Sequence, residues 1–289
     1  MGAPSRPRLS PVVALHKSRA VVTGRRAIGE SDRIVEFYTR AYGKVRGVAR
    51  SARRMRSRFG SALELFTLGE LVFFDSGRSE LVRVDHFDIV HPFVGVREDL
   101  DRLGRGAWMV ECLSRLSADR DPHPALFGLV VRSLRALEGR VAPPPRVMIG
   151  FAVRAVDLLG HRPRLDRCMA CGRPHPLPSP ALDMAAGGLI CARCPPTPDA
   201  LAVSGSGLGA LQRLQRLGWD EGLRLPLGPP VQRELVTLLE GVVARLMGRM
   251  AHSSRFITQT RRGLTMVREP EPPRSGARSD KALGPPGSP

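Results

Sequence analysis

Long apolar segments are absent from this 289-residue chain. Its longest apolar runs, at 12–15 and 126–131, are far shorter than the ~20 residues that a membrane-spanning helix needs. The first 11 residues are polar and interrupted by proline, unlike an export signal, and Arg6 stands where a myristoylation signal requires Ser or Thr. We therefore expect a soluble, cytoplasmic protein that does not associate with membranes.

Sequence signatures of catalysis are also missing. The chain contains no Gly-x4-Gly-Lys-[Ser/Thr] nucleotide loop, no Gly-x-Ser-x-Gly, no His-Glu-x-x-His and no carboxylate cluster for two catalytic metal ions. Asp85 and Asp88 flank the end of an expected strand, and we interpret them as surface residues. We therefore predict a protein that is not an enzyme.

Lysine and acidic residues are scarce as well. Only Lys17, Lys44 and Lys281 are lysines, and 45 basic residues outnumber 27 acidic ones, which gives a formal charge of +18. A GC-rich genome would explain arginine in place of lysine, but not the excess of positive charge. Residues 1–58 hold 15 Lys or Arg and only three acids, so they supply +12 of that charge. Such concentration is typical of a surface that binds a polyanion, and we expect nucleic acid as the partner.

The part of the chain between residues 18 and 88 has the pattern of short strands separated by turns. Period-two alternation and turn residues predict strands at 19–25, 33–39, 44–49, 66–74 and 81–87. Five short strands fit a small, partly open barrel of the oligonucleotide-binding (OB) kind. We therefore predict an OB-fold nucleic-acid-binding domain at 11–90, preceded by a disordered N-terminus at 1–10.

Beyond residue 92 the apolar period changes from two to about 3.6, which indicates helices. Apolar stripes and boundary residues predict helices at 97–117, 124–138, 145–159, 206–218 and 230–250. We therefore expect an α+β, multi-domain fold, in which the barrel is followed by an all-α domain. The boundaries that we predict for the later parts are 91–165 and 197–267 for the helical domain, 166–196 for a zinc-binding insertion and 268–289 for a disordered tail.

Four of the five cysteines form two Cys-x2-Cys pairs with 19 residues between them, a spacing typical of a tetrahedral zinc site. The predicted ligands are Cys168, Cys171, Cys191 and Cys194. Two alternatives are a pair of disulfides, which a reducing cytosol disfavours, and a redox-active dithiol, which would need only one Cys-x2-Cys pair. His161 and His175 are close enough in sequence to substitute as ligands, while Cys112 lies on a helical stripe as a packing residue. Because four thiolates leave no open position on the ion, we predict one structural zinc ion.

A run of basic residues between 40 and 58 contains no carboxylate. We predict that it binds DNA through Arg40, Lys44, Arg46, Arg50, Arg53, Arg54, Arg56 and Arg58. Such cations bond phosphates and release counterions, so binding is independent of sequence and weakens steeply with salt. Tyr38, Tyr42 and Phe59 flank or interrupt the run and could stack on bases, although packing inside the barrel is the alternative, above all for Tyr38. For the whole run, the alternative is a solvated basic loop without a role.

Several segments, taken in order, resemble the bacterial recombination mediator family RecO. They include Gly29-Glu30-Ser31-Asp32-Arg33, Gly43-Lys44-Val45-Arg46-Gly47, Ser57-Arg58-Phe59, Ala107-Trp108-Met109-Val110-Glu111 and Cys168-Met169-Ala170-Cys171-Gly172. The resemblance extends over residues 18–250 or so, and the order and spacing of the segments are more specific than any one of them.

The resemblance implies an N-terminal OB domain, a helical domain with an inserted zinc element, and a role in recombinational DNA repair at the bacterial nucleoid. Proteins of this family bind single- and double-stranded DNA and anneal complementary strands. They act with RecR and sometimes RecF, engage the acidic C-terminal tail of single-strand-binding protein, and help to load RecA on the coated strand.

Three other functions compete with this interpretation. A zinc-ribbon/OB protein that binds RNA or the ribosome would use a basic barrel equally well. A transcription regulator would need a helix-turn-helix pair with a basic recognition helix, which is not apparent in the sequence. A nuclease would need the carboxylate cluster that the chain lacks.

Overall fold

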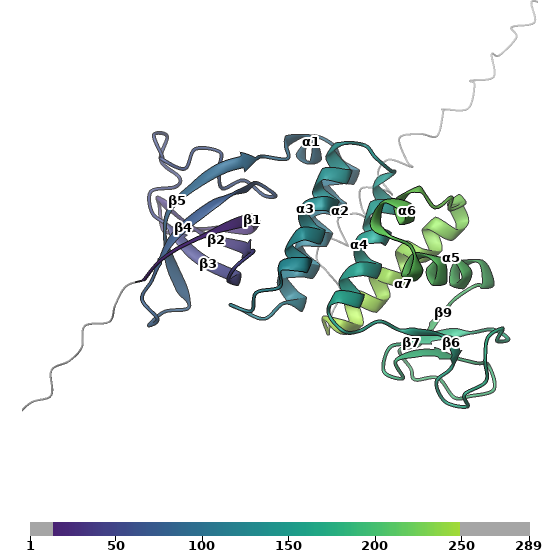
Figure 1. The fold of residues 1–289 in the computed structure, drawn as a ribbon. Helices are drawn as coiled ribbons and strands as arrows, with labels where there is room; N and C mark the ends of the chain where they lie inside the picture. Colours follow the sequence, from purple (N-terminus) through teal and green to yellow (C-terminus); the bar gives the residue numbers. More distant parts are fainter. Residues whose placement is uncertain (1–13, 249–289) are drawn as a thin grey trace, which may run out of the picture.

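The computed structural model describes residues 14–248. Figure 1 shows a β-barrel, a group of helices beside it, and a small sheet beyond the helices. This arrangement, with four cysteines brought together in the small sheet, confirms the predicted fold class. The segments predicted to be disordered, 1–10 and 268–289, lie outside the described residues, as does 249–267. The division of the chain into domains at particular boundaries stays a prediction.

The barrel contains the five predicted strands. They are β1 Ala14–Ile28, β2 Asp32–Thr39, β3 Gly43–Ala49, β4 Leu68–Asp75 and β5 Leu81–His91. Their order around the barrel is β1-β2-β3-β5-β4, and β1 pairs with both β2 and β4. The barrel is therefore closed, where the sequence predicted a partly open one. The reason is the length of β1: it extends from Ala14, five residues before the predicted start, and a bulge between Val22 and Gly24 bends it from one partner to the other.

The helical part consists of seven helices within the described residues. They are α1 Val94–Arg97, α2 Leu100–Leu116, α3 Pro124–Glu138, α4 Pro144–Leu158, α5 Gly205–Arg216, α6 Trp219–Arg224 and α7 Pro229–Leu246. The five predicted helices are confirmed, except that the first is divided at Asp99. The Asp99 side chain accepts the Arg102 N–H and caps α2, which separates it from the short α1. Helix α4 packs against α2, α3 and α7, and Cys112 is buried in this core as predicted.

The cysteine-containing segment forms a small sheet that the sequence did not predict. Its strands are β6 Arg164–Cys168, β7 Ala181–Asp183, β8 Gly188–Ile190 and β9 Leu201–Ala202, in the order β6-β8-β7-β9. β7 and β8 form a hairpin just before the second cysteine pair, and Gly187, with φ +79°, lies in its turn. The side-chain amides of Gln212 and Gln215 on α5 donate to the carbonyls of Leu165 and Pro163, at 2.7 and 3.1 Å. The sheet is thereby fixed to the helices.

The barrel and the helices meet at two positions where only glycine leaves enough room. A Cβ on Gly106 of α2 would lie 2.9 Å from the ring of Phe66, which is fully buried between the two parts. A Cβ on Gly43, whose φ is +62°, would lie 2.1 Å from the carbonyl oxygen of Asp121 in the α2–α3 loop. The two glycines therefore allow the helices to approach the barrel closely.

Candidate nucleic-acid interface and metal centre

The basic residues predicted to bind DNA fall into two groups at opposite ends of β2 and β3. Arg40, Lys44 and Arg46 lie on the turn between these strands and on the first half of β3, next to the helices. The other five come after the last residue of β3, and they are Arg50, Arg53, Arg54, Arg56 and Arg58. We call residues 50–58 the basic loop. The structure therefore does not bring all eight predicted residues together.

The basic loop is anchored at both ends. Ala52 and Phe59 are buried among the apolar side chains of the barrel interior. Asp32 at the start of β2 accepts the Ser51 N–H at 2.7 Å and the Ser31 hydroxyl at 3.0 Å. These two hydrogen bonds, that of Ser51 first, hold the pKa of Asp32 below its ordinary value. The Asp32 carboxylate therefore fixes the point at which the loop leaves the barrel.

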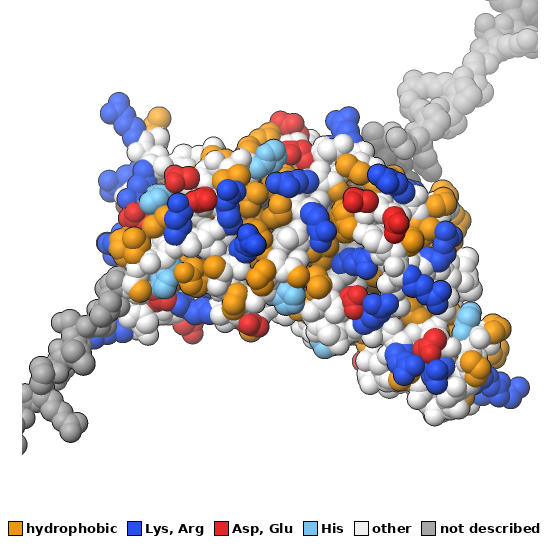
Figure 2. Space-filling view, in the orientation of Figure 1, with side chains coloured by type: hydrophobic (Ala, Val, Ile, Leu, Met, Phe, Trp, Pro, Cys, Tyr) orange, Lys and Arg blue, Asp and Glu red, His pale blue; other side chains and the backbone are white. Residues whose placement is uncertain are grey.

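The arginines of the basic loop are exposed, and no carboxylate among the described residues forms an ion pair with them, although Asp32 interacts with Arg50 and Arg54 at longer range. Arg53 donates to the backbone carbonyl of Gly29 at 3.1 Å, and the Arg58 guanidinium lies over the Phe59 ring, 5.1 Å from its centroid. Within residues 14–248, no ion pair involves an arginine of this loop. Figure 2 shows basic side chains projecting from the outer end of the barrel and also across the helical part. The loop charge is free to meet phosphates.

The β1–β2 hairpin adds basic residues that the sequence reasoning did not include in the site. Arg25 and Arg33 both pair with Glu64, the latter at 3.7 Å, so this carboxylate partly offsets their charge. Arg26 is exposed and forms no ion pair with any residue that the structure describes. The sequence pattern that could have indicated Arg26 is the Arg25-Arg26 pair just before the turn at Gly29. This turn lies next to the basic loop, since Arg53 donates to the Gly29 carbonyl.

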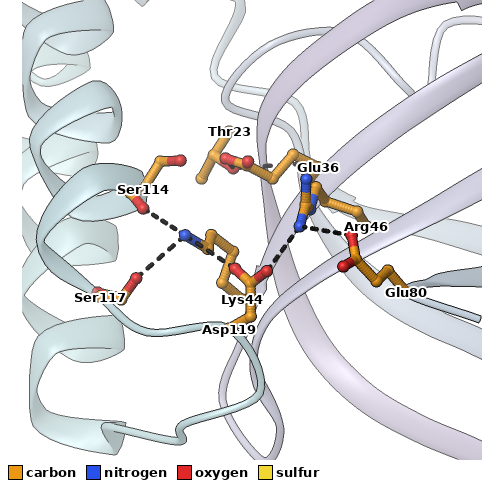
Figure 3. Close-up of polar contacts among 8 residues, drawn as sticks. All are labelled: Thr23, Glu36, Lys44, Arg46, Glu80, Ser114, Ser117 and Asp119. Atoms are coloured by element: carbon orange, nitrogen blue, oxygen red, sulfur yellow. Dashed lines mark hydrogen bonds and ion pairs between the residues drawn. The ribbon is translucent and has the colours of Figure 1, made fainter. Parts of the chain in front are cut away.

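Lys44 is held within the contact between the barrel and the helices (Figure 3). Its Nζ donates to the carbonyl oxygens of Ser114 and Ser117, at 2.7 and 3.0 Å, and lies 2.9 Å from Asp119 Oδ1. These carbonyls are at the C-terminal end of α2, where the helix dipole favours a cation. The Lys44 side chain is only 15% exposed. Its charge is therefore satisfied inside the protein.

Arg46 lies beside Lys44 on the same face of β3. Its Nη2 is 2.6 Å from Asp119 Oδ2 and 3.6 Å from Glu80 Oε2 (Figure 3). Hydrogen bonds from Lys44 and then from Arg46 hold the pKa of Asp119 below its ordinary value. Arg40 is exposed on the β2–β3 turn, close to this junction and apart from the basic loop. The first three predicted residues thus border the helices.

The aromatic residues suggested for base stacking do not present their rings to solvent. Tyr38 and Phe59 are 1% and 3% exposed, so packing is the correct interpretation for both in this structure. Tyr42 is half-buried and packs edge-on against His16 and Phe73, with ring centroids at 4.9 and 5.6 Å. Stacking by these three residues is therefore not supported by the fold.

The four predicted metal ligands lie together at one end of the small sheet. The Sγ atoms of Cys168, Cys171, Cys191 and Cys194 are all within 4.8 Å of one another, and His161 and His175 are not part of this group. The Sγ atom of Cys191 is 3.9 Å from that of Cys171 and 3.7 Å from that of Cys194. A tetrahedron with metal–sulfur distances of about 2.3 Å has sulfur–sulfur edges of about 3.8 Å. The donor set therefore fits a tetrahedral metal ion.

The electrostatics of the thiols also suit a cation. Burial acts to raise the pKa of Cys168, but backbone N–H groups of Cys171, Cys191 and Ala170 bond its sulfur and lower that pKa to about 6. Hydrogen bonds with Cys171 and Cys191 instead raise the pKa of Cys194 to about 12. Cys168 therefore ionises readily whereas Cys194 does not, and a bound dication would favour the thiolate form of both.

Asp183, buried at the end of β7, organises the chain around this centre and was not anticipated from the sequence. Its carboxylate accepts N–H groups of Ala185 and Ala186 at 3.0 and 3.1 Å, and that of Thr197 at 2.8 Å. These bonds tie the β7–β8 turn to the segment that follows Cys194. They oppose the effect of burial, and the net result is a pKa of Asp183 below its ordinary value.

No described helix is long and apolar enough to span a membrane.

Both parts of the chain match known family models. Residues 13–93 match the model described as "Recombination protein O N terminal", and residues 97–255 match "Recombination protein O C terminal". The first range contains the barrel and the basic loop, and the second contains helices α2 to α7 and the cysteine cluster.

Proteins described as "DNA repair protein RecO" are similar over most of their length. One from Anaeromyxobacter dehalogenans is 37% identical over 246 residues, which cover 83% of this chain and 96% of that protein. One from Myxococcus xanthus is 35% identical over 232 residues, or 80% and 92% of the two chains. One from Frankia casuarinae is 37% identical over 211 residues, or 72% and 85%.

Proposed function

The chain belongs to the RecO family of DNA repair proteins, and on that premise we propose that it is a recombination mediator. In this role it binds single- and double-stranded DNA and anneals complementary strands. The observation that carries the proposal is the basic loop, with five exposed arginines and no ion pair within the described chain.

Annealing requires that two polyanions approach each other, so their mutual repulsion must be screened. Arginines anchored at one end of a closed barrel can contact phosphates of both strands without reading their sequence. The pairing then follows from base complementarity. The proposal involves no covalent chemistry, and we expect the protein to be a mediator and not an enzyme.

Further parts of the proposal rest on the family resemblance. We expect the chain to act with RecR and in some settings with RecF, to engage the acidic C-terminal tail of single-strand-binding protein, and to help load RecA. The four cysteines would hold one zinc ion, whose thiolate ligands leave no position for water or substrate. The role of this ion is structural, because metal binding stabilises a segment that has few apolar residues of its own.

Charge reversal in the basic loop tests the DNA contact. Arg53→Glu together with Arg54→Glu should weaken DNA binding at least about tenfold. The slope of log K against log salt should become shallower by the amount that corresponds to about two phosphate contacts. Arg213→Glu with Arg216→Glu on α5 removes the same charge from exposed helical positions and serves as the matched control. Equal losses in the two double variants would show that net charge, and not the loop, determines binding.

A strand-annealing assay tests the mediator function. Complementary oligonucleotides coated with single-strand-binding protein are mixed with the chain over a salt series, and annealing above the spontaneous rate is expected. Competition between single-stranded DNA and RNA of the same sequence separates this function from RNA or ribosome binding. A clear preference for RNA, without annealing of coated DNA, would refute the proposal.

A further inference from the structure

Met55 is the most exposed large apolar side chain in the part of the chain that the structure describes. Its relative exposure is 105%, so it is as accessible to water as in an isolated peptide. It lies between Arg54 and Arg56 in the basic loop, and both of these neighbours are also exposed. The loop thus presents an apolar group in the middle of its positive charge.

The fold gives no structural reason for an apolar residue at this position. The loop is anchored by Ala52 and Phe59, which are buried in the barrel, and its exit is fixed by the hydrogen bond from Ser51 to Asp32. Met55 does not belong to either apolar core. Leaving its side chain in water is unfavourable, so its burial is available as a source of binding energy for a partner.

The position of Met55 limits what that partner surface can be. The surrounding arginines form no ion pair with a carboxylate among residues 14–248, although Arg50 and Arg54 act on Asp32 at longer range. Their five charges exceed that single carboxylate and favour a polyanion, and a polyanion with an apolar surface between its charges is a nucleic acid with accessible bases. The Phe59 ring next to the loop is only 3% exposed, which leaves Met55 as the loop's own apolar contact for a base. A flexible thioether contacts aromatic faces favourably.

We propose that Met55 is a wedge that packs against base faces where stacking is interrupted, while the flanking arginines hold the phosphates. The inference rests on the proposed function, because it requires that the basic loop contacts DNA. Apolar side chains inserted at base steps unstack neighbouring bases, and insertion is easiest where the duplex is already open. Met55 therefore directs the protein to gaps and to junctions between single and double strands.

The test compares full-length variants on two DNA molecules. One is a blunt duplex, and the other is the same duplex with a single-stranded gap that carries 2-aminopurine beside the junction. Met55→Gln keeps the side-chain length but makes its end polar, and it should weaken binding to the gapped DNA by about two- to tenfold. Binding to the blunt duplex and the salt slope should not change, because the arginines remain. Met55→Phe should restore gap binding.

The fluorescence of 2-aminopurine provides the specific signal. Emission should rise when the wild-type protein unstacks the base, and this rise should shrink with Met55→Gln. Val141→Gln removes an apolar side chain that is 65% exposed after α3, and it should behave as the wild type does. Thermal unfolding of each variant should match the wild type, since neither side chain is buried.

Two results would overturn the inference. If Met55→Gln binds the gapped DNA and changes its fluorescence as the wild type does, while Arg53→Glu with Arg54→Glu still weakens binding, the wedge is wrong and the DNA-binding proposal stands. If Met55→Gln instead alters self-association in sedimentation and leaves both DNA affinities unchanged, Met55 contacts a second copy of the chain. Absence of wild-type binding to either DNA would refute the proposed function itself.

Discussion

Replacing Lys44 by alanine separates the two roles that basic residues of β3 could have. If Lys44 contacts DNA, as its sequence context predicts, the variant should bind DNA less tightly and with a smaller salt dependence. If Lys44 instead joins the barrel to α2, as its three contacts indicate, the variant should be less stable while the folded protein binds DNA normally. We predict the second result.

The expected loss of stability follows from those contacts. Two charge-assisted hydrogen bonds to α2 carbonyls disappear, and Asp119 loses one of its two cationic partners, the other being Arg46. One such bond contributes about 1.5–3 kcal/mol, but Asp119 is half exposed and keeps Arg46, which reduces the effect. We expect Lys44→Ala to lower the free energy of unfolding by about 2–3 kcal/mol in urea. Asp119→Ala in both backgrounds should reveal coupling of about 1 kcal/mol between the two residues.

The pH dependence of this loss has a definite sign. The pKa of Asp119 is below its ordinary value in the folded protein, so its ionised form stabilises the fold. That stabilisation is complete above the ordinary pKa and disappears as the pH falls through the lower, folded-state pKa. The difference between Lys44→Ala and the wild type should therefore be largest near neutral pH and should shrink in acid. A constant difference would contradict the assignment of the Asp119 ion pair.

Salt dependence provides the decisive comparison for DNA binding. Eight phosphate contacts would give a slope of log K against log salt of about −7 on duplex DNA, whereas five from the basic loop would give about −4.5. Lys44→Ala should leave the wild-type slope unchanged at temperatures where both proteins are folded. If it reduces the slope by about one and leaves stability within about 0.5 kcal/mol, Lys44 is a DNA contact and the structural reasoning is refuted.

Three further predictions concern other parts of the fold. Gly43→Ala should lower the free energy of unfolding in urea by at least about 2 kcal/mol, because the new Cβ meets the α2–α3 loop. Gly77 has a similar positive φ but open space around it, so Gly77→Ala should lower the same quantity by only about 1 kcal/mol. Metal analysis should find one zinc ion per chain and less in Cys191→Ser, and substoichiometric zinc in wild-type protein purified without chelator would exclude the site. Asp32→Asn should accelerate hydrogen exchange of the Ser51 amide relative to the wild type near neutral pH, but not below the folded-state pKa of Asp32. Equal exchange rates in the variant and the wild type at all pH values would show that the carboxylate does not hold the loop.

The sequence predicted the elements of the fold better than their contacts. Strands and long helices follow from local periodicity, which is why all five barrel strands and five helices were placed. Closure of the barrel depends on pairing between β1 and β4, from Val21 with Leu68 to Ala14 with Asp75, and no local pattern reports pairing over such a separation. The cysteine pairs were recognised because ligand spacing is itself local, but Asp183 was missed because its backbone partners lie on two separate turns.

The division of the basic run has a physical cause in the geometry of a strand. β3 crosses the barrel from the helical side to the outer end, so residues a few positions apart in sequence are carried to different environments. Counting charge along the chain treats Arg46 and Arg53 alike. In the fold, however, Arg46 meets Asp119 in the α2–α3 loop, while Arg53 meets only a backbone carbonyl. The capacity to bind a polyanion therefore depends on which cations form no ion pair with a carboxylate. The basic loop holds five of these at the end away from the helices, and Arg40 is exposed at the other end.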